Sequence, residues 1–265
     1  MRSVVLGRGF LGEEYERHGY EVWGRDRFEI QDANTIDFDD ALLDYDVIIN
    51  CIGKSDTRWC ERPENWAETL LVNGILPSRL SALCEEHGKT LVHISTGCLY
   101  DRNDYPQTET DFTVSHCRYT VAKWVGENGL NPDRDLILRP RLFFNDQDHP
   151  KNLLRKLPRF TSYLDELNSF THTAEVVRAT SALVAAGCVG VYNVACEGFL
   201  TVFDLAQLVG LRGGKIHADT LHLREGLYLV NNILSLDKLK QRYTPANLVD
   251  SVLEANAALN GEAAS

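Results

Sequence analysis

Short apolar runs that end in glycine or in small polar residues recur through the first half of the chain. They cover residues 3–6, 20–24, 46–53 and 91–94. Such continuous runs are typical of buried strands in a parallel sheet. Helical spacing of apolar residues lies between them, over residues 11–18 and again after Pro63, and the segment 54–63 is expected to be a loop. This alternation predicts an α/β fold with a Rossmann-type, doubly wound parallel sheet.

A glycine-rich turn follows the first of these strands. Its residues are Gly7, Arg8, Gly9, Phe10, Leu11 and Gly12. In a G-x-G-x-x-G pattern between strand and helix, glycines allow close backbone approach and the helix N-terminus meets a pyrophosphate. After the next strand, an acidic residue would bind the ribose of NAD, whereas an arginine would accommodate the 2′-phosphate of NADP. Arg8 and Arg25 favour NADP, and Asp26 keeps NAD open.

Composition narrows the function classes. The chain has 265 residues and a net charge of −11, which argues against a nucleic-acid partner or an anionic membrane surface. Its 7 cysteines include no C-x-x-C pair and fit reduced thiols better than disulfides. No signal-peptide pattern and no membrane-spanning apolar run stand out, so we expect a cytoplasmic protein. His217 and His222 lack matching ligands, and no metal is assigned.

Residues 91–101, LVHISTGCLYD, are the stretch around which the chain is organised. A buried strand breaks there into a small polar turn that contains Ser95, Thr96 and Cys98. In an open parallel sheet, ligands and chemistry lie at the carboxyl ends of the strands. These three side chains are therefore expected at the mouth of a site.

A helix is predicted over residues 115–129, and it carries Tyr119 and Lys123. Four residues apart on a helix, the two side chains share one face. The ammonium can then lower the pKa of the phenol and leave it able to donate or accept a proton near neutral pH. We predict that this pair works with the hydroxyls of Ser95 and Thr96.

The second half of the chain is predicted to form a smaller substrate-binding lobe. Helices are expected at residues 151–160, 173–186, 201–209 and 246–259, and a strand at 189–194. Thr173 and Thr201 are candidate helix N-caps. We expect a dinucleotide-binding domain at 1–142 and a mainly substrate-binding lobe at 143–265, with about 160–195 returning to the sheet.

The glycine turn, Asn50 at a strand end, Asn73 in the next helix, and the Ser-Thr-Gly turn with Tyr119 and Lys123 resemble an extended short-chain dehydrogenase/reductase. Residues 138–141, 165–171 and 190–195 are similar to the dTDP-4-dehydrorhamnose reductase branch, over roughly residues 1–240. Shorter matches resemble the bifunctional UDP-4-keto-6-deoxyglucose 3,5-epimerase/4-reductases of rhamnose synthesis. They are residues 59–61, 96–98, 149–156 and 231–232.

The resemblance implies NAD(P)H-dependent reduction of the 4-keto group of a nucleotide-linked 4-keto-6-deoxyhexose. Tyr119 would donate the proton, with Thr96 or Ser95 on the same oxygen, and Lys123 would bind the nicotinamide ribose. Further cofactor contacts are expected at Asn50, Cys51, Gly53 and Asn73. Substrate contacts are expected at Arg141, Asn152, Asn231 and Asn232. Cys98 and Lys156 would be the acid–base pair of an added 3,5-epimerisation.

Departures from the branch keep alternatives open. The glycine loop is one residue shorter than the usual G-x-x-G-x-x-G, and Leu229-Val230 replaces an Arg-Pro. One alternative is an NDP-sugar 4-epimerase or dehydratase, although a dehydratase would carry an acidic pair at Gly97-Cys98. Another is a non-catalytic, NADP-binding regulatory subunit, against which the intact catalytic set argues. The nucleotide, the sugar and the oligomeric state, a homodimer included, stay open.

Overall fold

The computed structural model describes residues 1–32, 36–111, 113, 117–225 and 231–261. Two compact units divide the chain. Unit 1 consists of Met1–Leu99, Thr113–Arg139 and Leu183–Tyr192, and unit 2 consists of Tyr100–Phe112, Pro140–Ala182 and Asn193–Ser265. Neither unit is one continuous stretch. The pair Leu229-Val230, noted in the sequence, lies outside the described residues.

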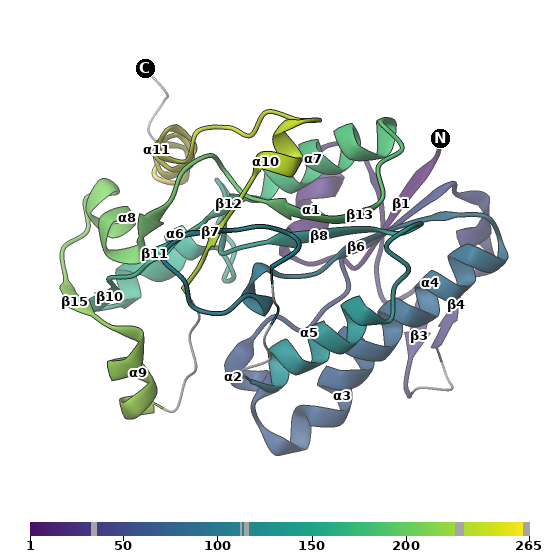
Figure 1. The fold of residues 1–265 in the computed structure, drawn as a ribbon, viewed down its shortest axis with the longest axis horizontal. Coiled ribbons are helices and arrows are strands. Elements are labelled where there is room, and N and C mark those ends of the chain that lie inside the picture. The colour runs from purple at the N-terminus through teal and green to yellow at the C-terminus, as the bar shows by residue number, and fades with distance from the viewer. Residues whose placement is uncertain (33–35, 112, 114–116, 226–230, 262–265) are drawn as a thin grey trace. The chain divides into compact units, whose positions relative to one another are not determined.

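A six-stranded sheet has the order β13-β8-β6-β5-β1-β2. Its strands are β1 (Ser3–Leu6), β2 (Glu21–Trp23), β5 (Val47–Asn50), β6 (Thr90–Ile94), β8 (Leu136–Pro140) and β13 (Gly190–Val194). β1 pairs in parallel with both β2 and β5, and β6 pairs in parallel with β5 and β8. The strand order reverses beside β1, which is where such sheets bind ligands. The predicted doubly wound α/β sheet is confirmed (Figure 1).

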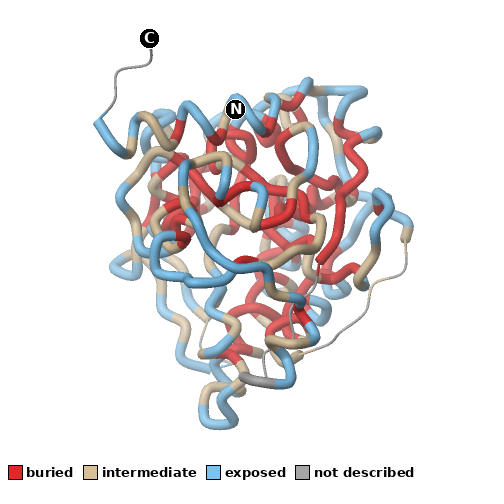
Figure 2. Tube along the Cα trace, turned by 90° about the vertical axis from the view of Figure 1, so that its left-hand side faces the viewer, coloured by how far each residue is buried: buried red, intermediate tan, exposed pale blue. Residues whose placement is uncertain are grey.

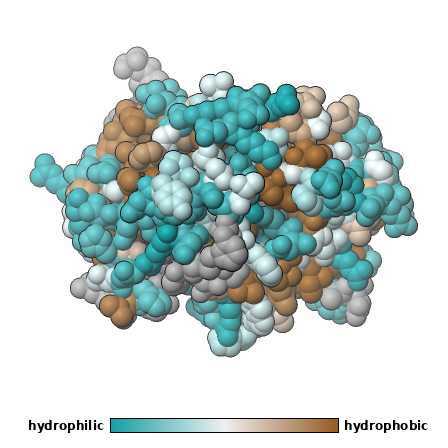
Figure 3. Space-filling model, in the orientation of Figure 1, coloured by the Kyte–Doolittle hydropathy of each residue, from teal (hydrophilic) through white to brown (hydrophobic). Residues whose placement is uncertain are grey.

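Helices cover both faces of the sheet in unit 1. Helix α1 (Phe10–Arg17) lies on one face, and α3 (Trp66–Leu70), α4 (Leu76–Glu86) and α5 (Arg118–Asn128) lie on the other (Figure 1). Because side chains alternate along a strand, Val4 and Leu6 join the core formed with α4. The buried residues (red) gather inside the chain trace of Figure 2, whereas hydrophilic and hydrophobic side chains are intermixed on the face in Figure 3.

The expected strands are all present, each near its predicted bounds. The helix expected after Pro63 is divided, because a π-helical segment, Leu71–Ile75, separates α3 from α4. The expected loop 54–63 was wrong in part: it contains α2 (Thr57–Cys60), which Asp56 caps by accepting the Trp59 N–H at 3.1 Å. A 3₁₀ turn, Pro63–Asn65, follows. Residues 115 and 116 of the expected helix 115–129 lie outside the described part, and α5 is the helix that the structure shows there.

Short elements complete unit 1. Strands β3 (Phe28–Ile30) and β4 (Ile36–Phe38) form an antiparallel pair, and a 3₁₀ turn (Asp40–Asp44) precedes β5. Another 3₁₀ turn, Gly97–Leu99, follows β6.

The part of unit 2 that the structure describes contains four two-stranded pairs. They are β7 (Pro106–Gln107) with β16 (Ile233–Leu234), β9 (Phe143–Phe144) with β12 (Thr171–His172), β10 (Ser162–Leu164) with β15 (Gly214–Ile216), and β11 (Leu167–Asn168) with β14 (Leu200–Thr201). The helices that carry residues of this unit are α6 (Leu153–Lys156), α7 (Thr173–Ala185), α8 (Val202–Leu208), α9 (Ala218–Glu225), α10 (Asp237–Lys240) and α11 (Leu248–Leu259).

Two predictions about these helices need correction. The helix expected at 151–160 begins at Leu153, ends at Lys156 and passes into a 3₁₀ turn, Leu157–Arg159, because Pro158 has no N–H with which to continue the α-helical hydrogen bonds. Thr201 caps α8 as predicted, by accepting the Asp204 N–H at 2.9 Å. Thr173, however, is the first residue of α7, and the Ala174 N–H donates to His172 Nδ1 at 3.1 Å. None of the described helices has the length and hydropathy needed to cross a bilayer.

Close packing of α5 on the π-helical segment depends on Gly126. A Cβ added there would lie 2.1 Å from the carbonyl oxygen of Asn73, far inside any real contact. Gly74 sits on the opposite side of the same junction, where an added Cβ would lie 3.3 Å from the Ala122 carbonyl oxygen. The backbones can therefore approach this closely only because Gly126 lacks a side chain, and the space at Gly74 is also tight.

We expect Gly126→Ala to lower the free energy of unfolding by about 1–3 kcal/mol or more, because α5 must move away from the π-helical segment. Urea unfolding followed by circular dichroism measures the change. Asn128→Ala, at an exposed position of the same helix, is the control and should stay within about 0.5 kcal/mol of wild type. Equal stability of the Gly126→Ala protein would show that the junction has slack.

Candidate active site

The glycine turn after β1 has the geometry that a bound pyrophosphate needs. Gly7 has φ of +104°, and a Cβ there would lie 2.9 Å from the Ile52 nitrogen. A Cβ on Gly12 would lie 2.0 Å from the Gly7 carbonyl oxygen, whereas nothing lies within 4 Å of the Cβ position of Gly9. Helix α1 begins next to that open space, and no side chain caps it. The turn therefore fits the phosphates of a dinucleotide.

The three arginines near this turn have different surroundings. Arg8 donates to the Val22 carbonyl oxygen at 3.2 Å and pairs with Glu16 at 3.0 Å. Arg27 pairs with Asp39 at 2.9 Å and lies over the Trp23 ring. Arg25 is exposed and makes no ion pair or hydrogen bond with any described residue. It lines an open hollow of about 540 Å³ together with residues 26–29 and 37–39.

The exit of β5 is fixed by Asn50, which is fully buried. Its Oδ1 accepts the Ile52 N–H at 3.0 Å, so its Nδ2 must donate to His93 Nδ1, 3.1 Å away. This assigns the imidazole proton of His93 to Nε2, which is buried without a hydrogen-bond partner in the described structure. Burial and the charge of Lys123 hold the pKa of His93 well below its ordinary value, and the ring is neutral.

Asn73 lies in the π-helical segment and holds the loop after β5. Its Oδ1 accepts the Lys54 N–H and its Nδ2 donates to the Lys54 carbonyl oxygen, each at 2.9 Å. Cys51 and Gly53 lie in that loop, and a Cβ on Gly53 would lie 3.3 Å from Asn73 Oδ1 and 3.5 Å from Lys123 Nζ. The predicted cofactor contacts at this strand exit thus lie around the lysine. π-helical turns often occur at functional sites because they redirect a side chain.

Tyr119 and Lys123 of α5 reach the end of β6. The Tyr119 phenol lies close to the Thr96 side chain, and burial raises its pKa above the ordinary value. Lys123 is 5% exposed; its Nζ donates to the Ile94 carbonyl oxygen at 3.0 Å, and burial lowers its pKa to about 8. The expectation that the ammonium lowers the pKa of the phenol was therefore wrong for this state, because desolvation of the tyrosine dominates.

Thr96 and Ser95, expected to share one task, lie in different contacts. Thr96 faces Tyr119, and its Oγ1 accepts the Cys98 N–H at 3.1 Å. Ser95 Oγ donates to Glu127 Oε2 on the same helix as Lys123. Cys98 is partly exposed and lies near Tyr119. Thr96 is thus the hydroxyl next to the phenol, and Ser95 is engaged elsewhere.

The loop that contains Glu61 fixes the start of α5. Glu61 Oε1 accepts the Tyr119 N–H at 3.2 Å, and the Glu61 carbonyl oxygen accepts from Arg118 Nη1 at 2.6 Å. The carboxylate also lies where a helix N-terminus favours negative charge. The sequence analysis included residues 59–61 in the family resemblance but predicted no role for Glu61.

Three of the predicted substrate residues lie close in unit 2. Arg141 Nη2 donates to Asn168 Oδ1 at 2.8 Å, and the Asn232 N–H approaches the same oxygen at 3.4 Å. Asn231 precedes Asn232, and its carbonyl oxygen accepts the Asn103 N–H at 3.3 Å. All three predicted residues are buried. Asn168 is the contact that joins two of them.

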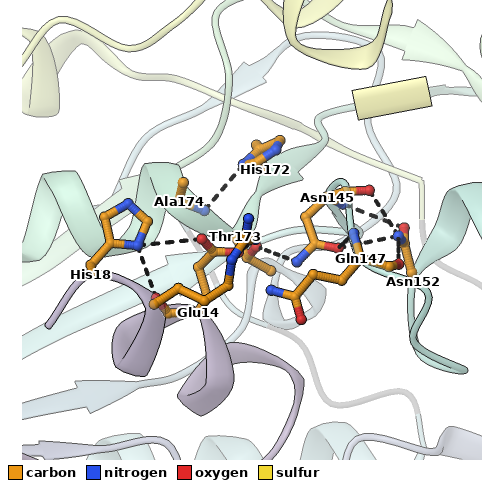
Figure 4. A network of polar contacts seen from close by, with 9 residues as sticks. Glu14, His18, Asn145, Gln147, Asn152, His172, Thr173 and Ala174 are labelled. Carbon is orange, nitrogen blue, oxygen red and sulfur yellow. Dashed lines mark hydrogen bonds and ion pairs between the residues drawn. The ribbon is translucent and has the colours of Figure 1, made fainter. Parts of the chain in front are cut away.

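Asn152 has a different task from the substrate contact predicted for it. It is fully buried, its Nδ2 donates to the carbonyl oxygens of Asn145 and Gln147, and its Oδ1 accepts the Leu154 N–H and caps α6. Figure 4 shows this cluster, in which Asn145 also donates to Thr173. The same view includes a separate pair in unit 1, His18 with Glu14. Asn152 thus braces the loop before α6, and Lys156 ends that helix.

The sequence reasoning missed Glu127 and Arg139, which form a buried ion pair between α5 and β8. A signal for each was present. Glu127 follows Lys123 by four residues and so extends the stripe that begins at Tyr119. Arg139 is a charge within an apolar strand, and a buried arginine requires a partner. Among the described residues, no group of His, Cys, Asp or Glu is placed to hold a metal ion.

Residues 4–219 match the family model of the RmlD substrate binding domain. The chain belongs to this family. The family predicted from the motifs is thereby confirmed. The chain is also similar to a dTDP-4-keto-6-deoxy-D-glucose reductase from Streptomyces niveus, with 30% identity over 64% of this chain and 62% of that protein. It therefore spans less than two thirds of that relative's length.

Other similarities agree. A bifunctional dTDP-4-dehydrorhamnose 3,5-epimerase/dTDP-4-dehydrorhamnose reductase from Arabidopsis thaliana is 25% identical over 76% of this chain and 70% of its own. A UDP-rhamnose synthase from Acanthamoeba polyphaga mimivirus has a TM-score of 0.82 at 18% identity, covering 97% and 99% of the two chains. A dTDP-4-dehydrorhamnose reductase from Bacillus anthracis, solved with NADP, has a TM-score of 0.78 at 16% identity, covering 96% and 97%. The two solved structures establish the fold.

Because burial raises the pKa of Tyr119, its phenolate should not form in the ligand-free protein at pH values where exposed tyrosines ionise. Absorbance at the phenolate band, titrated for wild type and Tyr119→Phe, measures this. We expect the two curves to coincide up to about pH 10, the ordinary tyrosine value. A wild-type excess of one phenolate below that pH would mean that Lys123 governs the phenol after all.

Proposed function

We propose that the protein reduces the 4-keto group of a nucleotide-linked 4-keto-6-deoxyhexose, with NADPH preferred over NADH. The observation that carries the proposal is the meeting of Thr96, Tyr119 and Lys123 at the carboxyl end of β6. The glycine turn after β1 fits the dinucleotide phosphates. Relatives named as reductases of 4-keto-6-deoxy sugars support the same reaction.

The protein residues manage the proton and the developing charge. NADPH, held at the glycine turn after β1, would supply the hydride for the keto carbon. Tyr119 donates its phenolic proton to the oxygen as that oxygen becomes an alkoxide, and Thr96 donates a hydrogen bond to it. The phenolate left behind then lies on the same helix face as the Lys123 ammonium, and solvent returns the proton. A phenol that stays protonated in the resting enzyme, as burial of Tyr119 ensures, suits a general acid.

The charge of Lys123 sets the expected pH dependence. Its pKa of about 8 lies below that of an exposed lysine, so the ammonium predominates at neutral pH and is lost as the pH rises through that value. In the proposed reaction, Lys123 holds the nicotinamide ribose and stabilises the phenolate. Reduction should therefore decline on the alkaline side, near the pKa of this lysine.

In the proposed function, unit 1 holds the cofactor. Unit 2 holds the nucleotide sugar through residues such as Arg141, Asn231 and Asn232. The enzyme acts in the cytoplasm, in deoxysugar synthesis of the rhamnose type. Its net charge of −11 makes nucleic acid an unsuitable partner. A non-catalytic subunit fits less well, because the acid, its hydroxyl partner and the lysine lie together. A dehydratase fits less well, because Gly97-Cys98 stand where it would carry an acidic pair. An NDP-sugar 4-epimerase stays the alternative.

A second activity, 3,5-epimerisation, is supported by one observation. Cys98 is partly exposed and lies beside Tyr119, where a thiol could exchange a proton at a carbon next to the keto group. The Arabidopsis relative carries both activities in its name. Lys156, the predicted partner of Cys98, is half-buried in unit 2. Epimerisation by this pair stays a prediction.

The test supplies NADPH and a panel of dTDP-, UDP- and GDP-4-keto-6-deoxyhexoses, and follows NADPH absorbance with product NMR. Tyr119→Phe should keep the fold and lower kcat about 10²-fold or more, because it deletes the general acid. Tyr105→Phe, at an exposed tyrosine, is the matched control. Retention of more than half of the wild-type kcat by Tyr119→Phe would assign the acid to another group. Running the assay in D₂O reports epimerisation as deuterium at carbons 3 and 5.

Arg25 should carry the preference for NADPH, because it is exposed beside the end of β2 with its charge unpaired in the described structure. Arg25→Ala should narrow the free-energy gap between NADPH and NADH binding by about 1–2 kcal/mol, the range of a charge-assisted contact. Calorimetric titration of both cofactors measures the gap. Arg212→Ala, at an exposed position in unit 2, should leave it unchanged. Equal affinities in the wild-type protein would reject the assignment.

A further inference from the structure

Three side chains of α5 form a stripe along the end of β6. Tyr119, Lys123 and Glu127 are spaced four residues apart and so share one helix face. Each meets a different group of the strand or its exit. Tyr119 meets the Thr96 hydroxyl, Lys123 the carbonyl oxygen of residue 94, and Glu127 the Ser95 hydroxyl. Three successive turns of α5 therefore each contact the end of β6 or the residues that follow it.

Glu127 is the most fully bonded member of the stripe. Arg139, from the neighbouring strand β8, donates through Nε to Glu127 Oε1 at 3.0 Å and Oε2 at 3.1 Å, and through Nη2 to Oε1. Ser95 Oγ donates to Oε2. Glu127 is 9% exposed and Arg139 is 5% exposed. A buried ion pair is stable only when its hydrogen bonds are satisfied, and this carboxylate has a donor on each oxygen.

The same carboxylate acts on Lys123. Burial lowers the pKa of this lysine, and the charge of Glu127 is the largest influence that raises it. The other groups around Lys123 are the thiols of Cys51, Cys60 and Cys98 and the neutral ring of His93. Arg139, which binds the same carboxylate, is a second buried cation. Loss of the charge of Glu127 would remove the carboxylate that acts on both cations.

We propose that Glu127 is a positioning residue of the reductase: held by Ser95 and Arg139, it fixes α5 against the end of β6 and places a carboxylate one helical turn from Lys123 while Tyr119 reacts. This inference rests on the proposed function. It also explains why Ser95 does not face Tyr119. The serine connects the strand end to the carboxylate, and the neighbouring Thr96 is left to contact the phenol.

The test variant is Glu127→Gln, which keeps the shape and the acceptor oxygen but removes the negative charge. Loss of that charge lowers the pKa of Lys123, since an opposite charge favours the ionised form. Reduction needs the ammonium, so the alkaline limb of kcat should move to lower pH by about one unit. Activity at pH 8 should then fall several-fold more than activity at pH 6.5.

Unit 1 offers a control with the same chemistry. Asp135 is fully buried, accepts from Ser81 Oγ at 2.6 Å and pairs with Arg134 at 3.0 Å. It precedes β8, whereas Arg139 lies near the end of that strand. Asp135→Asn removes a serine- and arginine-bonded carboxylate without touching the stripe on α5. It should lower stability and leave the alkaline limb in place.

NADPH affinity gives a readout that does not need turnover. Lys123 binds the nicotinamide ribose in the proposed function, so affinity measured by calorimetry should weaken as the pH rises through its pKa. In Glu127→Gln this weakening should begin about one pH unit lower. If wild type turns over no sugar in the panel, the proposed reduction fails, while the affinity series still decides the task of Glu127.

The outcomes are separable. The inference would be overturned if Glu127→Gln had the same alkaline limb and the same pH profile of NADPH affinity as wild type. It would also be overturned if the alkaline limb moved as far in Asp135→Asn as in Glu127→Gln. If Glu127→Gln does not fold, Ser95→Ala keeps both charges and cuts only the contact between strand and carboxylate. It should lower kcat several-fold with the limb unmoved and the NADPH affinity near wild type. If Ser95→Ala had the kcat of wild type, the proposed positioning of α5 through Ser95 and Glu127 would be rejected.

Discussion

A lysine side chain buried where water is largely excluded is the feature on which the rest of the site depends. Burial disfavours the charged form of Lys123, and an unpaired charge in such surroundings would lose its proton or destabilise the fold. Two groups favour the charged form: the carbonyl oxygen of Ile94, which accepts from Lys123 Nζ at 3.0 Å, and the carboxylate of Glu127 one helical turn away. His93 stays neutral and adds no second charge on that side. The pKa of about 8 is the balance of these opposing effects.

The position of α5 follows from backbone contacts rather than from its own side chains alone. Gly126 lets the helix approach the π-helical segment, because any Cβ would meet the Asn73 carbonyl oxygen. The side chain of Asn73 in turn holds the backbone of Lys54 by two hydrogen bonds, and Lys54 lies within the loop that leaves β5. A displacement of α5 at this contact would therefore move both Tyr119, which α5 carries, and the loop after β5 that is predicted to contact the cofactor. The contact between Gly126 and Asn73 thus couples the catalytic tyrosine of the proposed reaction to the predicted cofactor loop.

Much of the fold could be predicted because buried parallel strands are short apolar runs, and these runs end where the glycines stand. The same reasoning missed the π-helical segment, since the apolar positions before and after residue 73 keep nearly helical spacing. It also overextended the helix before Pro158, where a missing N–H outweighs the pattern. Asn152 shows a further limit. An amide can contact substrate or brace a loop, and only the burial of both its polar atoms decides which.

The candidate site was predicted least well where polar residues pair across elements. Glu127 and Arg139 lie on a helix and a strand, and no local spacing links them. The buried cluster contains two cations, Lys123 and Arg139, and one anion, Glu127, so its net charge is positive by one. The net charge of the whole protein is −11. A fixed excess of positive charge stabilises negative charge that develops during a reaction. An alkoxide, and then a phenolate on Tyr119, are the anions that the proposed reduction would place there. The surface charge of the protein therefore says little about the electrostatics of its reaction, which depend on a few buried groups.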